Sequence, residues 1–215
     1  MQVDTSQRGG RAAPAIAALV LGGLALFWAA FLVAAAANPG YSHRRDYVSV
    51  LAAQGAERGW LGVIAIAAAG LAMVAASAIV RPLSRMAATA VALAGIGFVV
   101  VSFTRLECPN GAAGCGLGGR FEISGGTEVT HWTAATLATT LLIAGMAVTG
   151  LALFQSRRRL PGVLTLAAAA VTAAAFLATG GQTPGEEQRV GIVVATTWLA
   201  AAALASLVRP RRVEG

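Results

Sequence analysis

The chain has 215 residues, of which 57% are hydrophobic and only 12% are charged, and its mean hydropathy is +0.71. A soluble domain carries about twice that share of charged residues, so the composition excludes an ordinary soluble protein and indicates a membrane protein. The formal net charge of +7 comes from arginines in the short gaps between apolar segments, which argues for membrane topology and against nucleic-acid binding.

Six segments are apolar over the roughly 20 residues that a membrane-spanning helix needs. The first, residues 14–37, exceeds the ~7–15 apolar residues of a signal peptide, so we expect it to be retained. The other five segments are residues 61–80, 86–104, 131–154, 162–180 and 190–208. The sequence therefore predicts an all-α membrane protein, a six-transmembrane-helix bundle over residues 14–208, with tails at 1–13 and 209–215.

A polar stretch, residues 38–60, separates the first two predicted spans. Four of its side chains fall on one face of a helix: Tyr47, Val48, Leu51 and Ala52. Ser42 is a suitable residue to cap the start of that helix, and Gly55 can adopt the left-handed conformation that ends one. We expect a short amphipathic, interfacial helix over residues 43–54 in this loop.

The arginines are unequally divided between the two predicted sides of the membrane. Ten lie on the side of the termini: Arg8, Arg11, Arg81, Arg85, Arg157, Arg158, Arg159, Arg209, Arg211 and Arg212. Six lie on the other side: Arg44, Arg45, Arg58, Arg105, Arg120 and Arg189. Because arginine accumulates on the cytoplasmic side, both termini are expected in the cytoplasm and the chain in the cell (plasma) membrane. The long loops then face outward, and such loops are where functional sites are usually placed.

Two features inside and between the later spans predict structure more than chemistry. Threonines recur along two spans, and we interpret them as packing residues between helices: Thr133, Thr136, Thr140, Thr165, Thr172 and Thr179. Cys108 and Cys115 are six residues apart in an outer loop, where an oxidising environment favours a disulfide. A zinc site with His43 and His131 lacks the usual short cysteine spacing, so no metal is expected.

Polar groups from four segments are expected at one depth on the outer side: Asp46, Ser49, Arg105, Glu107, His131 and Arg189. Arg105, Glu107, His131 and Arg189 are the candidate ligand-binding residues of an outward-facing polar pocket. Four of the six polar residues are the catalytic candidates, which a serine, a histidine and an acid would require: Ser49, Asp46, Glu107 and His131. The alternative is a structural salt-bridge rim, so the sequence leaves open whether the protein is an enzyme.

Three stretches resemble one family of membrane proteins. The first is "PGYSHRRDYVSVLAAQG" after the first span, and the second is "RLECPNGAAGC", followed by a histidine that opens the next span. The third is "PGEEQRVG", which leads into a last span that contains tryptophan. Together they resemble the DUF998 family of bacterial integral membrane proteins, although that family usually has glycine in place of Ala52 or Ala53. The resemblance implies a fold and a topology and no particular activity.

Three functions therefore stand in order. The first is a membrane protein that binds or modifies an amphiphile, such as a lipid or isoprenoid head group, with membrane lipids as its other partners. The second is a non-catalytic structural, sensor or partner subunit, and the third is a small-solute transporter, which the lack of charges inside the spans disfavours. No cofactor is expected because no nucleotide-binding or hydrolase motif is present. The oligomeric state is left open.

Overall fold

A computed structural model describes residues 6–107, 126–180 and 183–208 of the chain. Over these residues it contains six long helices and one short one, and no strand. The long helices are α1 (Ser6–Ala37), α2 (Gly59–Val80), α3 (Arg85–Phe103), α4 (Gly126–Gln155), α5 (Arg159–Ala178) and α6 (Pro184–Val208). All six are long and apolar enough to cross a membrane, so the predicted six-helix membrane protein is confirmed.

The observed helices extend beyond several of the predicted spans. Helix α4 begins at Gly126 instead of residue 131, and α6 begins at Pro184 instead of residue 190. The added turns carry acidic residues, Glu128 in α4 and Glu186 and Glu187 in α6. Acidic side chains stabilise the positive end of a helix dipole, so the helices continue past the apolar segments from which the spans were predicted.

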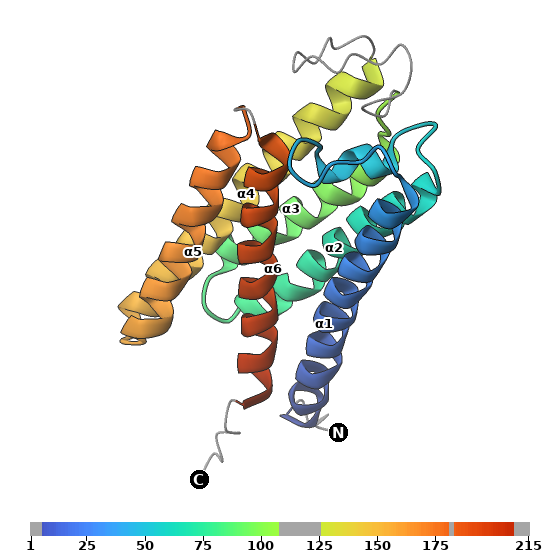
Figure 1. The fold of residues 1–215 in the computed structure, drawn as a ribbon. Coiled ribbons are helices and arrows are strands. Elements are labelled where there is room, and N and C mark those ends of the chain that lie inside the picture. Colours follow the sequence, from blue (N-terminus) through green and yellow to red (C-terminus); the bar gives the residue numbers. More distant parts are fainter. Residues whose placement is uncertain (1–5, 108–125, 181–182, 209–215) are drawn as a thin grey trace.

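The helices form a closed ring in chain order. Each helix packs against the next, and α1 also packs against α6 (Figure 1). The start of α1 and the end of α6 lie at the same end of the bundle. The opposite end holds the 3-10 helix η1 (Val48–Ala52), within the α1–α2 connection, and we call it the η1 end.

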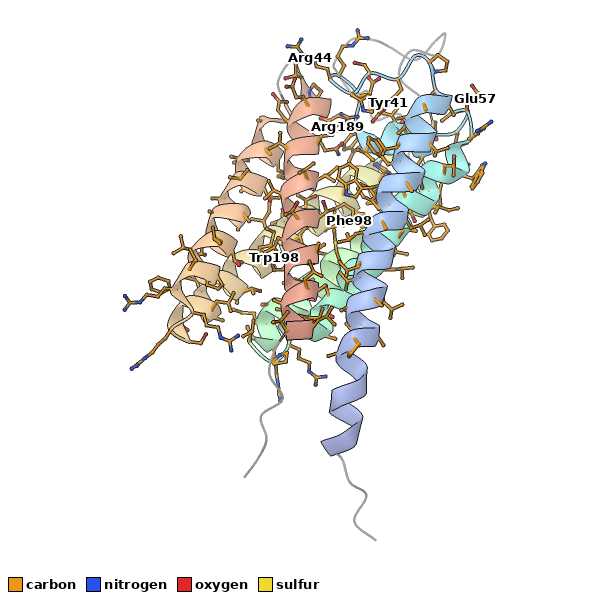
Figure 2. All side chains as sticks on the ribbon, turned by 60° about the horizontal axis from the view of Figure 1, so that its bottom comes forward. Tyr41, Arg44, Glu57, Phe98, Arg189 and Trp198 are labelled. Carbon is orange, nitrogen blue, oxygen red and sulfur yellow. The ribbon has the colours of Figure 1, made fainter. Side chains whose placement is uncertain are left out.

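The core of the bundle is made of small and apolar side chains from every long helix. Its closest helix contact is between α2 and α3, where a Cβ on Gly70 would lie 2.6 Å from the carbonyl oxygen of Gly95. Small residues at such crossings let membrane helices approach closely. Figure 2 shows Phe98 and Trp198 among the helices, with Tyr41, Arg44, Glu57 and Arg189 towards the η1 end.

The predicted amphipathic helix over residues 43–54 differs from what the structure contains. A helix is present, but it is a 3-10 helix of five residues, Val48–Ala52, and all five are buried. The reason is tertiary: side chains from other helices bond its backbone groups, and the segment lies over the end of the bundle. Gly55 does adopt the expected left-handed conformation, with φ of +83°.

Candidate functional site

The segment Tyr47–Ala53, which we call the η1 cap, is held to three other parts of the chain. Its Val48 N–H donates to Oε1 of Gln188 in α6 at 2.8 Å. The Tyr47 hydroxyl donates to the carbonyl of Thr179 at 2.9 Å, which ties the cap to the end of α5. On the opposite flank, Arg105 donates to the carbonyls of Ala52 and Ala53 at 2.7 and 2.8 Å.

Helix α2 supports the η1 cap from below through a glycine. A Cβ added to Gly62 would lie 2.5 Å from the carbonyl carbon and oxygen of Leu51 and from the nitrogen of Ala52. Those contacts are far shorter than real Cβ atoms make, and they are with backbone that cannot rotate away. The cap therefore packs directly on the backbone of α2, and only glycine permits this distance at position 62.

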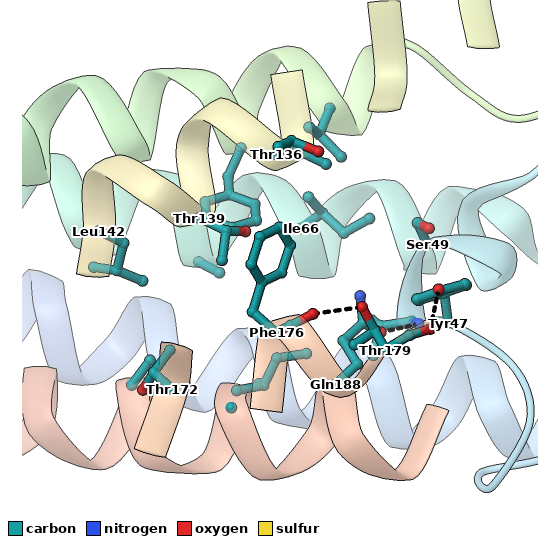
Figure 3. A pocket seen from close by; sticks show the side chains of 18 of the residues that line it. Tyr47, Ser49, Ile66, Thr136, Thr139, Leu142, Thr172, Phe176, Thr179 and Gln188 are labelled. Carbon is teal, nitrogen blue, oxygen red and sulfur yellow. Dashed lines mark hydrogen bonds between the residues drawn. The ribbon is translucent and has the colours of Figure 1, made fainter. Parts of the chain in front are cut away.

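Beneath the η1 cap, the ring of helices encloses a cavity of about 390 Å³. All six long helices and the cap contribute to its lining, and Figure 3 shows many of these side chains. The large apolar lining residues are Phe27, Ile66, Met73, Phe98, Leu142, Phe176 and Ile192. The polar ones are Tyr47, Ser49, Trp132, Thr136, Thr139, Thr172, Thr179, Gln188 and Thr196. No aspartate, glutamate or arginine of the described chain lines it.

The polar groups of the cavity fall into two kinds. The hydroxyls of Thr172 and Thr196 each donate to a carbonyl one turn earlier in their own helix, at 2.8 Å. By contrast, the hydroxyls of Ser49, Thr136 and Thr139 make no hydrogen bond to another described residue. The Oε1 atom of Gln188 accepts from the cap, while its Nε2 donates to no described group. These latter groups can bond a molecule inside the cavity.

Arg189, a predicted ligand-binding residue, lies half-buried in α6 and binds the α1–α2 connection. Its guanidinium donates to the carbonyls of His43 and Asp46 and to the hydroxyl of Tyr41. It also lies 5.4 Å from the centre of the Tyr41 ring and 5.6 Å from that of Phe31. Cation–π contacts of this kind strengthen when they are sheltered from water. Arg189 therefore joins α6 to α1 and to the loop that carries the η1 cap.

The same cluster contains a buried acid and a buried phenol. Asp46 is 6% exposed, and one of its carboxylate oxygens accepts the N–H of Ser42 at 2.7 Å. Burial raises the pKa of Tyr41 to about 12, an effect that the positive charge of Arg189 opposes. Tyr41 is therefore a neutral hydroxyl at physiological pH.

His131, a predicted catalytic and ligand-binding residue, lies on the other side of the cap. It is only 1% exposed, and its Nδ1 is 2.6 Å from the carbonyl oxygen of Thr104 at the end of α3. Its ring packs edge-on against Trp132 with 5.6 Å between centres, and Trp132 packs in turn against Tyr47 at 5.4 Å. His131 thus joins α4 to α3.

The predicted polar residues are consequently divided among different environments. Ser49 is 8% exposed and faces the cavity. Asp46 and Arg189 belong to the contact with α6, and His131 and Arg105 to the contacts around α3. Glu107 is exposed at the η1 end. No hydrogen bond or ion pair among the described residues joins His131 to Ser49, Glu107 or Arg189.

Several cavity residues were not singled out as site residues from the sequence. Thr136 and Thr172 were interpreted as packing residues, and Gln188 and Thr139 were not considered. The recurrence of threonine on two spans was the available signal, but helix packing and a polar cavity wall produce the same pattern. Cys108 and Cys115 lie outside the described residues, so their disulfide stays a prediction.

Comparison with known proteins identifies the family but not an activity. The family model described as "Protein of unknown function (DUF998)" matches residues 11–205. The chain therefore belongs to this family, as its sequence motifs suggested. No curated protein and no solved structure matches it.

Proposed function

We propose that this DUF998 protein binds an amphiphile within the membrane, in the cavity beneath the η1 cap. The observation that carries the proposal is the cavity of about 390 Å³, which has an apolar wall and several hydroxyl and amide groups. Binding sites for small molecules are typically ~300–1,000 Å³ and mainly apolar, with a few polar groups that orient the ligand. An amphiphile combines the same two properties.

The size of the cavity favours a ligand with one chain. At about 390 Å³, it lies near the small end of the range for ligand sites. A phospholipid with two chains has several times as many heavy atoms as such a volume accommodates. A single alkyl or isoprenoid chain lying beside Phe98, Leu142 and Phe176 matches the apolar wall better.

The orientation of the protein belongs to the same proposal. The excess of arginine on the side of the termini supports a cytoplasmic position for both ends in the plasma membrane. The η1 end then faces outward, and the cavity lies in the outer half of the bilayer. Its ligand would come from the outer leaflet.

One observation favours a second candidate, a non-catalytic structural subunit. Arg105 and Arg189 use their guanidinium groups on main-chain carbonyls within the protein, as a scaffold requires. The ion pair between Arg44 and Glu186 is exposed, and a surface pair of this kind contributes little stability. On this alternative the cavity is a packing defect without a ligand.

Photolabelling separates the two candidates. The purified protein in lipid nanodiscs would be irradiated with a long-chain alcohol that carries a diazirine and an alkyne in its tail. Binding in the cavity predicts saturable labelling of peptides from α4, α5 and α6, with competition by the unmodified alcohol. Labelling that spreads over lipid-facing residues and does not saturate would refute a binding site.

A matched pair of variants on α4 sharpens the test. Thr139→Trp places a large ring in the cavity and should abolish saturable labelling, because Thr139 lines it. Thr140→Trp adds the same ring at an exposed position on the same helix and should leave labelling unchanged. Equal labelling of both variants would also contradict the proposal.

A further inference from the structure

We infer that the cavity selects amphiphiles with an uncharged, hydroxyl-bearing head group, such as a long-chain or isoprenoid alcohol, over fatty acids and phosphate esters. This inference rests on the proposed function, since it names the class of ligand that the proposed site accepts. Its basis is the chemistry of the cavity wall.

The first argument is the absence of charge from the cavity wall. Among the described residues that line the cavity, every polar side chain is a hydroxyl, an amide or an indole. Burying an ionised carboxylate or phosphate without a partner is very unfavourable. A charged head group would therefore have to remain outside the cavity, whereas an alcohol can enter with its chain.

The second argument concerns the nearest cations, which are already engaged elsewhere. Arg105 donates to the carbonyls of Ala52 and Ala53, and it contributes no atom to the cavity lining. Arg189 donates to Tyr41 and to the carbonyl of Asp46 on the opposite flank of the cap. Neither arginine can approach an anion in the cavity unless it breaks the bonds that hold the cap.

The third argument is the match of hydrogen-bonding groups. The amide of Gln188 uses its oxygen on the Val48 N–H, so towards the cavity it offers only N–H donors. The Ser49 hydroxyl is both a donor and an acceptor. A ligand hydroxyl likewise accepts from one group and donates to another, so it can satisfy Gln188 and Ser49 together.

The positions of these groups also orient the ligand. Figure 3 shows Ser49, Tyr47 and Gln188 at one end of the cavity and Leu142 and Thr172 towards the other. The head group would lie at the first end, beneath the η1 cap. The chain would run along α4 past Thr139 towards Leu142, deeper in the bundle.

The test compares three photoreactive probes that share one diazirine-bearing chain and differ only in the head group. The probes are the alcohol, the corresponding carboxylate and the corresponding phosphate ester, each titrated against the wild-type protein in nanodiscs of uncharged lipid. The alcohol is expected to label cavity peptides at concentrations at least tenfold lower than either anion. If a charged probe labels the cavity as well as the alcohol does, the inference is wrong although the cavity binds amphiphiles. If no probe labels the cavity, the proposed function fails as well.

Conservative variants test the assigned groups. Ser49→Ala should weaken labelling by the alcohol about three- to tenfold, which corresponds to one lost hydrogen bond between neutral groups. Thr133→Val removes a hydroxyl from an exposed position on α4 that does not line the cavity, and it should change nothing. Unchanged labelling of a folded Ser49→Ala protein would show that Ser49 does not bind the head group.

Discussion

At the scale of single residues, the arginines of the η1 end act mainly on the protein's own backbone. Arg105 and Arg189 each donate to carbonyls in the segment that connects α1 and α2. Guanidinium suits this task because it carries several donors in a fixed plane. The sequence could place both arginines at the ends of spans. It could not show that the loop turns back and presents its carbonyls to them, because that path depends on contacts between distant segments.

The cluster around Arg189 leads to a prediction about Tyr41. The chain has two tyrosines, so Tyr47→Phe leaves Tyr41 as the only phenol to titrate. In the folded protein, the absorbance of tyrosinate should appear with a midpoint near pH 12 instead of the ordinary 10, because burial raises the pKa of Tyr41. The unfolded protein provides the control, and its tyrosine should ionise near pH 10.

The sign of the linked effect on stability follows from the same pKa. The folded state holds the phenolic proton more tightly than the unfolded state does, so Tyr41 contributes no pH dependence well below pH 10. Its stabilisation is lost as the pH rises from 10 towards 12. Ionisation of the folded Tyr47→Phe protein near pH 10 would show that Tyr41 is exposed and that the packing around Arg189 is wrong.

At the scale of elements, the long helices and the short one illustrate different limits of sequence reasoning. The spans are set by local composition, which is why all six were predicted. The apolar spacing in residues 43–54 fits an α-helix, yet only Val48–Ala52 is helical, and it is a 3-10 helix. Bonds from Gln188 and Arg105 replace the bonds of an α-helix there, and those residues are far away in the chain.

The contact between η1 and α2 gives a prediction at this scale. Gly62→Ala would place a methyl group 2.5 Å from the backbone of Leu51, so the η1 cap must move or α2 must bend. Overpacking of this kind typically costs ~1–3 kcal/mol. A lower unfolding temperature in detergent and weaker photolabelling of the cavity are expected together, since the cap forms part of its wall.

A second glycine provides the control for that substitution. Gly22 lies within α1, and a Cβ there would meet no atom within 4 Å. Gly22→Ala should leave stability unchanged or raise it slightly, because alanine favours a helix by up to ~1 kcal/mol over glycine. If Gly62→Ala behaves like Gly22→Ala, the η1 cap does not pack on α2 as the structure has it.

At the scale of the whole molecule, the fold could be predicted but the cavity could not. Six apolar segments with short polar links imply an antiparallel bundle whose ends meet on one side. The cavity depends on how six helices and the η1 cap leave space among them, and no local pattern encodes that space. Thr136 and Thr172 are equally compatible with tight packing and with a cavity wall, so only the assembled bundle separates the two interpretations.

The orientation of the bundle yields the last prediction. The chain has two cysteines, Cys108 and Cys115, both between α3 and α4 at the η1 end. The excess of arginine at the other end predicts that this loop faces outward, where an oxidising environment pairs thiols. In intact cells, a membrane-impermeant maleimide should therefore label the protein only after treatment with an impermeant reductant. Labelling without reductant would show that the thiols are unpaired on the outer side. Labelling that requires lysis of the cells would show that the loop is cytoplasmic, and both the orientation and the outer-leaflet source of the ligand would then be wrong.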